Sequence, residues 1–383
     1  MKKRKAAGHD ATIHTSRLKS VFYPLFCIFR QVSSAILLLS SIGSLLVGCT
    51  ESLGAGDQLQ LLVDENYKTF YNIARSAIMD MPKSKAWHEA VPQVQDVTID
   101  ATIDGSSQPA LYYDSGSDKK KPLLLVLHSW SANYRQQFSI PYGVWAVKND
   151  WVFIHPDYRG AFTNPEATAS EKAVRDVLDA VDYARNNANI DENRIYIAGF
   201  SGGGMMTLIM VGRYPEIWAG AVAWVPVYDL VQWYETTRRA AHDYSGHIIN
   251  SCSGEPIDGT DAGRECSKRS PSSYLKGARG RKVSVYISTG INDNFVPPSH
   301  SFQAFNDLAE PADRISQEDV QFIDGHHSLP DHMTGTFSDS LFKDAGINLL
   351  WEKESGNVVI KVHDGKHEVI YNAGLLWLSK QHR

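Results

Sequence analysis

The sequence has few cysteines, no excess of basic residues and no visible internal repeat. Only four of its 383 residues are cysteines, and none of them has the C-x-x-C spacing of a zinc site. The formal net charge is −5, which would repel a phosphate backbone, so no nucleic-acid partner is expected. Hydrophobic residues make up 43% and charged residues 21%, the composition of a globular protein with one large or two small domains.

The N-terminal region is basic and then lacks charge altogether. Residues 1–30 carry seven basic residues and one acid, and residues 31–48 carry no charged residue. The run from Leu46 to Cys49 resembles the lipobox of bacterial lipoproteins, in which a small residue precedes a cysteine that is lipidated. We therefore expect residues 1–48 to be a lipoprotein signal peptide and Cys49 to carry a lipid anchor to a bacterial membrane. The catalytic part would then lie outside the cytoplasm, in the cell envelope.

An uncleaved membrane anchor is the alternative for this leader. The run from Ile36 to Val47 is short, Ser-rich and weakly apolar for a stable membrane span, which favours the cleaved form. Removal of residues 1–48 would change the net charge from −5 to −11.

Two cysteines lie in the catalytic part, Cys252 and Cys266, both in one polar, Gly-rich stretch. In an oxidising compartment a disulfide between them is expected. The bridge would close a loop of about 15 residues, worth about 3 kcal/mol in the chain-entropy model. No metal is expected here, because no further ligands stand nearby.

Apolar runs alternate with helix-like segments along residues 95–383. A tether and an N-terminal helix, residues 60–80, are expected within residues 49–94. Strands are predicted at 97–102, 110–113, 123–127, 151–154, 195–198, 220–225, 283–287 and 358–362, and helices at 169–187, 205–211, 299–308 and 371–381. Residues 311–355 look irregular. This alternation predicts an α/β fold with a mostly parallel sheet, helices on both faces, and an active site beyond the carboxyl ends of the strands.

A Gly-rich turn, residues 199–204, stands between a predicted strand and a predicted helix. Gly199, Ser201 and Gly203 match the G-x-S-x-G nucleophile elbow. Such a turn lifts the serine above the sheet edge, and the backbone N–H of the next residue, Gly202, faces the same point. Ser201 is therefore the candidate nucleophile and Gly202 a candidate oxyanion donor.

A serine nucleophile needs a base, and the base needs an acid to hold its tautomer. In this fold class the order along the chain is Ser, then acid, then His. Asp293 follows the strand predicted at 283–287, and Asp229 is the alternative acid. His367 follows the last predicted strand and is preferred to His363, which is expected to lie on that strand.

The second oxyanion donor is expected in the loop after the strand at 123–127. Trp130 is the favoured donor and Ser129 the alternative. Elsewhere, His326, His327 and His332 could form a metal site. A polar loop is favoured because the helical H-x-x-x-H spacing is absent.

Several motifs together resemble the α/β-hydrolase fold, and most of all the catalytic domain of the prolyl oligopeptidase family. They are the elbow, the Gly-x-x-Asp-x-x-Val-Pro run at 290–297, the Gly-x-His-Glu run at 365–368 and the segment 156–160. The resemblance covers residue 95 to the end and implies a Ser201–Asp293–His367 triad and an acyl-enzyme intermediate, without a cofactor. Lys366 replaces a common glycine. His128-Ser129 replaces a His-Gly turn, so the oxyanion donor stays open.

The leading hypothesis is an extracytoplasmic serine hydrolase that cleaves an ester or a peptide bond. The resembling family carries a propeller that restricts substrates to short peptides, and residues 49–94 leave no room for one before the hydrolase region. An esterase acting on carbohydrate or other carboxylic esters is therefore an alternative. Two further alternatives are a non-catalytic binding protein and a metal-dependent hydrolase that uses the His326 cluster. Small molecules, oligosaccharide esters and peptides are the candidate substrates.

Residues 230–282 interrupt the alternation of strands and helices. We interpret them as an insertion that forms a lid over the pocket and sets specificity. Trp233 and Tyr234, near its start, would offer flat surfaces to an aromatic or sugar-like group. A surface excursion without substrate contact is the alternative.

Overall fold

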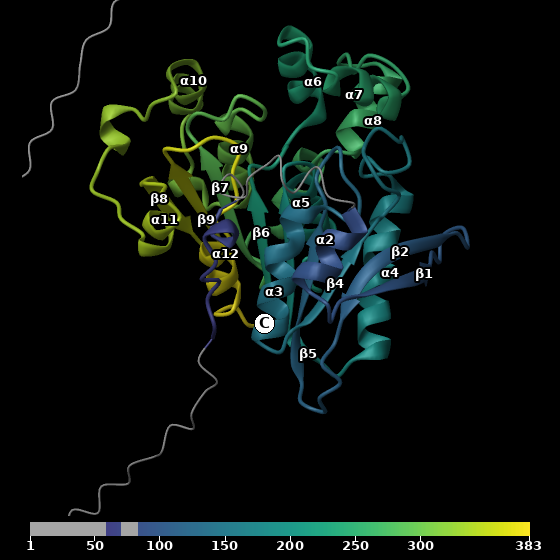
Figure 1. Ribbon diagram of the computed structural model, residues 1–383. Helices are drawn as coiled ribbons and strands as arrows, with labels where there is room; N and C mark the ends of the chain where they lie inside the picture. The colour runs from purple at the N-terminus through teal and green to yellow at the C-terminus, as the bar shows by residue number, and fades with distance from the viewer. Residues whose placement is uncertain (1–58, 70–82) are drawn as a thin grey trace, which may run out of the picture. The chain divides into compact units, whose positions relative to one another are not determined.

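A nine-stranded sheet with the order β1-β2-β4-β3-β5-β6-β7-β9-β8 organises the molecule (Figure 1). The computed structural model describes residues 59–69 and 83–383. The strands are β1 (Gln95–Asp100), β2 (Ser107–Tyr113), β3 (Lys121–Leu127), β4 (Val152–Pro156), β5 (Ile190–Phe200), β6 (Gly220–Trp224), β7 (Ser284–Gly290), β8 (Leu349–Ser355) and β9 (Val358–His363).

The six central strands, β4, β3, β5, β6, β7 and β9, are parallel. Antiparallel strands close the edges, with β1 and β2 beside β4, and β8 beside β9. Because parallel strands end at one edge, the loops after β3, β5, β7 and β9 meet there. The predicted mostly parallel α/β-hydrolase sheet is thus confirmed.

Helices cover both faces of the sheet. On one face, α4, α5 and α9 join a core with the odd-numbered residues of β3; on the other, α2, α3 and α12 pack with the even-numbered ones. The α-helices are α2 (Lys83–Ala90), α3 (Ile140–Lys148), α4 (Glu171–Asn187), α5 (Gly202–Arg213), α6 (Leu230–Arg239), α7 (Tyr244–Cys252), α8 (Asp261–Lys268), α9 (Pro298–Leu308), α10 (Gln317–His326), α11 (Ser340–Asp344) and α12 (Tyr371–Leu378). Short 3₁₀-helices are η1 (Glu65–Tyr67), η3 (Gln137–Ser139), η4 (Pro271–Ser273), η5 (Leu275–Ala278), η6 (Pro311–Asp313) and η7 (Asp331–Met333).

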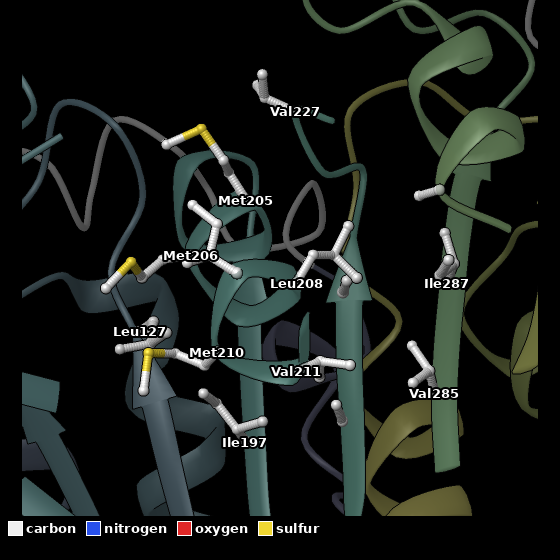
Figure 2. Close-up of a cluster of buried hydrophobic side chains, with 14 of the residues drawn as sticks. Leu127, Ile197, Met205, Met206, Leu208, Met210, Val211, Val227, Val285 and Ile287 are labelled. Atoms are coloured by element: carbon white, nitrogen blue, oxygen red, sulfur yellow. The ribbon is translucent and has the colours of Figure 1, made fainter. Parts of the chain in front are cut away.

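Helix α5 lies in the middle of the first core. Its residues from Gly202 to Val211 are all buried, as expected for a helix that is apolar on every side. Figure 2 shows Met205, Leu208 and neighbouring side chains of α5 against the apolar side chains of β3, β5 and β7. Each such side chain contributes about 1.5–3 kcal/mol by leaving water. The elbow that begins α5 therefore rests on a rigid support.

Most predicted strands and helices are present, and four regions differ. Helix α2 was not predicted. The helix predicted at 60–80 is wrong over residues 60–69, in which the 3₁₀-turn η1 is the one helical element. The remainder, residues 70–80, lies outside the described residues. Residues 311–355 were expected to be irregular but contain α10, α11 and the edge strand β8. Helix α3, between β3 and β4, was not predicted.

Residues 230–282 leave the sheet after β6 and return to it at β7. They form α6, α7, α8, η4 and η5, and Figure 1 shows the first three grouped at one end of the molecule. The predicted Cys252–Cys266 disulfide is confirmed, and it joins the end of α7 to α8. The stretch after Cys252 is largely helical and contains the buried Leu275.

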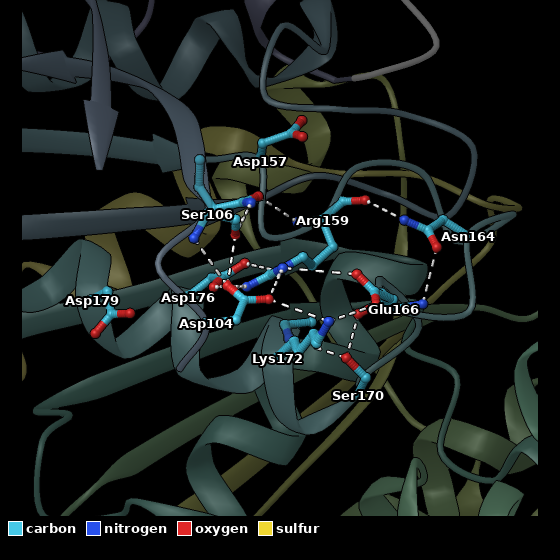
Figure 3. A network of polar contacts seen from close by, with 12 residues as sticks. Asp104, Ser106, Asp157, Arg159, Asn164, Glu166, Ser170, Lys172, Asp176 and Asp179 are labelled. Atoms are coloured by element: carbon cyan, nitrogen blue, oxygen red, sulfur yellow. Dashed lines mark hydrogen bonds and ion pairs between the residues drawn. The ribbon is translucent and has the colours of Figure 1, made fainter. Parts of the chain in front are cut away.

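A network of ion pairs ties the turn after β4 to the β1–β2 hairpin (Figure 3). The guanidinium of Arg159, 5% exposed, donates two hydrogen bonds to Asp176 and two to Asp104. Glu166 and Lys172 complete the network at the surface. The arginine neutralises both carboxylates and fixes the start of the loop that leads to α4.

The leader predictions fall on residues that the structure leaves undescribed. The signal peptide at 1–48 and the lipid site at Cys49 both lie within residues 1–58. Among the described helices, none is both long and apolar enough to cross a membrane.

Candidate active site

Ser201 occupies a strained turn between β5 and α5. Its backbone has φ 58° and ψ −115°, a conformation that non-glycine residues rarely adopt. The Ser201 N–H donates to Trp224 O at 2.9 Å, and Ser201 O accepts the first helical bond, from Met205 N, at 2.9 Å. The turn is thus held from both sides, as a nucleophile elbow requires.

The glycines of the elbow are needed for close backbone approach. A Cβ at Gly199 would collide with the carbonyl of Gly203 inside the turn. A Cβ at Gly203 would collide with the carbonyl oxygens of Leu127 and His128, at the end of β3. The elbow therefore packs directly on the neighbouring strand, which brings Ser201 beside the loop that follows β3.

Asp293 lies in the loop after β7 and is almost fully buried. Its Oδ1 accepts hydrogen bonds from Phe295 N at 2.8 Å and Val296 N at 3.0 Å. Its Oδ2 accepts from His367 Nδ1 at 2.7 Å. The loop amides orient the carboxylate, so that its second oxygen faces the imidazole.

His367 lies in the loop after β9 with its Nδ1 bound to Asp293, which leaves Nε2 for the base role. The ring of Phe200, the residue before the nucleophile, meets the imidazole edge-to-face with centroids 4.7 Å apart. This contact places His367 beside the elbow. The Ser201 hydroxyl makes no hydrogen bond to any described residue, a common state of a nucleophile without substrate.

The loops that carry Asp293 and His367 are bound to each other. Ile291 N donates to His363 O at 2.8 Å, and Asn292 N donates to Gly365 O at 3.1 Å. A Cβ at Gly290 would collide with the Gly365 and Lys366 carbonyls, so the loops touch backbone to backbone. The contacts between the ends of β7 and β9 therefore fix the distance between Asp293 and His367.

The two alternative triad residues have structural partners instead. Asp229 caps α6, with Oδ1 accepting from Val231 N and Gln232 N and Oδ2 accepting from the Ser272 hydroxyl. His363 ends β9, is fully buried, and its Nδ1 accepts from Gly365 N at 3.2 Å. Burial lowers the pKa of His363 to about 4, so it stays neutral at physiological pH.

The loop after β3 presents one free amide to the elbow. Ser129 N donates to Gln136 Oε1 at 2.7 Å and is therefore occupied. Trp130 N has no acceptor among the described residues, and a Cβ built on Gly202 would lie 2.8 Å from it. The backbone of Trp130 thus lies against Gly202, beside Ser201. This arrangement favours Trp130 over Ser129 as the second oxyanion donor.

Helices α6 and α7 of the insertion pack onto the loops of the site. The ring of Trp130 meets that of Trp233 edge-to-face, with centroids 4.7 Å apart, and Trp233 stacks with Tyr244 at 5.2 Å. The indole N–H of Trp233 donates to Phe295 O at 2.8 Å, in the loop of Asp293. Trp233 is buried by these contacts, and Tyr234 is also buried, so neither offers the open flat surface expected from the sequence.

The three histidines considered as metal ligands have separate partners. His326 Nδ1 lies 2.9 Å from Phe322 O, His327 Nδ1 lies 3.1 Å from Ile291 O, and His332 pairs with Asp319. In the described part of the chain, no group of three His, Cys, Asp or Glu side chains is arranged to hold a metal ion.

Two further buried histidines lie behind the site. Burial lowers the pKa of His300 to about 4, and its Nδ1 accepts from Tyr228 N at 3.0 Å. Burial also lowers the pKa of His128, whose Nε2 lies 2.7 Å from Asp157 O. Both serve the loops as hydrogen-bonding groups. The Nδ1 of His367, in contrast, hydrogen-bonds to a carboxylate.

Two residues that shape the site were not predicted from the sequence. Gln136 occupies the Ser129 amide, and His247 Nδ1 accepts from the Trp130 indole at 3.2 Å. Gln136 lies only seven residues after Ser129, so a hydrogen bond within this loop could have been anticipated. His247 is 117 positions from Trp130, and no local pattern marks it.

The sequence profile of the prolyl oligopeptidase family matches residues 143–337 of this chain, just over half of its length. The matched region contains Ser201, Asp293 and the whole insertion, while His367 lies beyond it.

The curated relatives match over shorter regions. Feruloyl esterase B of Thermothelomyces thermophilus is 28% identical over 34% of this chain and 47% of that enzyme. Acetylxylan esterase A of Emericella nidulans is 24% identical over 30% of this chain and 41% of that enzyme. The chain thus spans less than half of the length of these curated relatives. Among solved structures, the Pyrococcus horikoshii acylaminoacyl peptidase matches with a TM-score of 0.45 and 16% identity, over 56% of this chain and 34% of that one.

Proposed function

Since the chain belongs to the prolyl oligopeptidase family, we propose that it is a serine hydrolase whose nucleophile is Ser201, whose base is His367 and whose orienting acid is Asp293. The observation that carries this proposal is the 2.7 Å hydrogen bond from His367 Nδ1 to Asp293, beside the strained backbone of Ser201. A glycine-rich structural turn would not need a histidine held in one tautomer next to it.

The reaction would proceed through an acyl-enzyme. Ser201 Oγ attacks the acyl carbon while His367 Nε2 takes its proton, and the amides of Gly202 and Trp130 stabilise the oxyanion. The C–O bond to the leaving group breaks as His367 returns the proton to it. Water, deprotonated by His367, then attacks the acyl carbon. The bond from that carbon to Ser201 Oγ breaks, His367 returns the proton to Oγ, and the acid is released. Asp293 holds the imidazole through Nδ1 and stabilises the imidazolium.

We propose a carboxylic ester of a sugar or a phenolic acid as the substrate class. The support comes from the relatives named feruloyl esterase and acetylxylan esterase. Peptide cleavage is the second candidate, and the family as a whole favours it. Both substrates use the same triad, so the choice depends on the groups that the pocket accepts.

A substrate panel tests this proposal. Purified enzyme would be assayed with p-nitrophenyl esters, acetylated xylo-oligosaccharides, feruloyl esters and aminoacyl anilides. The proposal expects the highest kcat/KM on a sugar or feruloyl ester and loss of turnover in Ser201→Ala. A preference for aminoacyl anilides would reverse the order of the two candidates. Turnover that resists fluorophosphonate but is lost with a chelator would contradict a serine hydrolase.

We also propose that the enzyme is lipid-anchored through Cys49 outside the cytoplasm. The support is the basic leader and the run from Leu46 to Cys49. Two or more acyl chains suffice for stable anchoring. Detergent partitioning should retain the wild type and release Cys49→Ser. Equal release of both would contradict lipidation, and equal retention would indicate an uncleaved anchor.

A further inference from the structure

We propose that His247, on helix α7 of the insertion, is a positioning residue that fixes the oxyanion donor through the side chain of Trp130. The inference rests on the proposed function, because an oxyanion donor matters only if Ser201 is acylated. It connects the insertion, through the Trp130 side chain, to the Trp130 amide that would bind the oxyanion. The triad itself contains no such connection.

Trp130 has three polar groups, and two of them are occupied. Its carbonyl oxygen accepts from Phe162 N at 2.7 Å, and its indole Nε1–H donates to His247 Nδ1 at 3.2 Å. The backbone N–H, which lies against Gly202, is the group left for the oxyanion. The hydrogen bonds of the carbonyl and the indole therefore determine the direction of the backbone N–H.

The indole of Trp130 has little freedom to turn. The residue is 2% exposed, and its ring meets the rings of Phe162 and Trp233 edge-to-face, with centroids 5.2 Å and 4.7 Å away. These contacts hold the ring plane, while the bond to His247 fixes its polar edge. Loss of that bond would leave a buried N–H unsatisfied, which favours a shift of the side chain and its backbone.

Helix α7 is itself anchored, so His247 is a fixed acceptor. Asn250 Nδ2 donates to Thr163 O at 3.2 Å, and the Ser251 hydroxyl donates to Thr168 Oγ1 at 2.8 Å. The last residue of the helix, Cys252, is in the disulfide. Both contacts reach the loop between β4 and α4, the segment that also supplies Phe162.

The hydrogen bond from the Trp130 indole determines which nitrogen of His247 carries the proton. Because Nδ1 accepts from the indole, the proton of the neutral ring is on Nε2. Asparagine can place its Oδ1 close to the position of Nδ1, whereas leucine fills similar space without an acceptor. His247→Asn is therefore the conservative variant, and His247→Leu removes the interaction.

The test measures kcat and KM on p-nitrophenyl acetate, whose small size avoids substrate contacts with the insertion. His247→Leu should lower kcat by about 10–100-fold, the range expected for a displaced oxyanion donor, with KM within about twofold of wild type. His247→Asn should recover kcat to within about threefold of wild type. Trp130→Phe, which keeps the backbone amide but lacks the indole N–H, should match His247→Leu, and the double variant should be no worse than either single.

His326→Leu is the matched control, since it makes the same change at an exposed histidine that contacts its own helix. An unchanged kcat in His247→Leu would overturn the proposal, as would an equal loss in a folded His247→Asn. Multiplicative losses in the double variant would also contradict it. If His247→Leu fails to fold, the kcat of Trp130→Phe tests the proposal instead. A wild-type kcat in Trp130→Phe would refute the role of the indole–His247 hydrogen bond. Turnover that survives Ser201→Ala would instead refute the proposed function, and the inference with it.

Discussion

At the scale of single residues, each candidate catalytic group is held in place by its neighbours. Two loop amides orient Asp293, a phenylalanine ring abuts His367, and close backbone packing fixes Ser201. The groups are thus in place before substrate binds. Preorganisation of this kind lowers the barrier because little rearrangement is needed during the reaction.

The Asp293→Asn variant tests the role of the acid. An amide at this position can donate to His367 Nδ1, which would put the imidazole proton on Nε2 and remove its ability to act as a base. We expect kcat to fall by about 10⁴-fold with a small change in KM, as in other triads with this change. Steady-state kinetics on p-nitrophenyl acetate would measure it, and circular dichroism would verify the fold. A loss of less than about tenfold would contradict the assignment.

The triad candidates could be predicted because each follows a recognisable strand and the order along the chain is fixed. The oxyanion donor was left open between Ser129 and Trp130, because the choice depends on Gln136, whose contact is made by a side chain. His247 could not be predicted, since its bond joins segments 117 residues apart. Trp233 was expected to face substrate, but packing against Trp130 and Tyr244 buries it.

At the scale of elements, continuous apolar runs marked the buried parallel strands correctly. Strand β8 was missed because it is an antiparallel edge strand, in which the short apolar run Leu349 to Trp351 is followed by three charged residues. Helix α10 was missed because only Val320 and Ile323 of its residues are buried, too few for a clear stripe. The formation of a strand or helix with one exposed face depends on the elements that it packs against, and its own sequence shows little of that packing.

The disulfide provides a prediction about the insertion. Cys252→Ser/Cys266→Ser should lower the free energy of unfolding by about 3 kcal/mol, because the unfolded chain regains loop entropy. It should also raise KM for large esters and change the substrate ranking, since α7 loses one of its anchors near the site. Urea unfolding and the ester panel would measure both effects.

Turnover of p-nitrophenyl acetate should persist in the same variant, because the triad is untouched. This activity serves as the internal control for folding. An unchanged substrate ranking, in a folded variant that has lost the bridge, would mean that the insertion is only a surface feature.

At the scale of the whole molecule, buried neutral histidines link stability to pH. Burial lowers the pKa of His300 and of His363 from 6.5 to about 4. Between these values the unfolded chain binds more protons than the folded one, so acid favours unfolding. The free energy of unfolding should therefore be fully retained above pH 6.5 and fall as the pH drops from about 6.5 to about 4. Each histidine contributes at most about 1.4 kcal/mol per pH unit.

Urea unfolding at pH 7.5, 6 and 5 would measure this dependence. His363→Asn keeps an acceptor for Gly365 N but cannot be protonated, so its stability should fall less steeply with acid than that of the wild type. His326→Asn, at an exposed site, should keep the wild-type slope. Equal slopes for wild type and His363→Asn would contradict the account of the buried histidine.

The central claim, that Ser201 is an activated nucleophile, is tested most directly by covalent labelling. Native protein treated with a fluorophosphonate should gain the mass of one adduct, and peptide mapping should place it on the segment from Gly199 to Gly204. Heat-denatured protein and Ser201→Ala should gain none, because activation needs both the fold and the hydroxyl. An adduct that persists in Ser201→Ala, or its absence from active wild type, would contradict the claim.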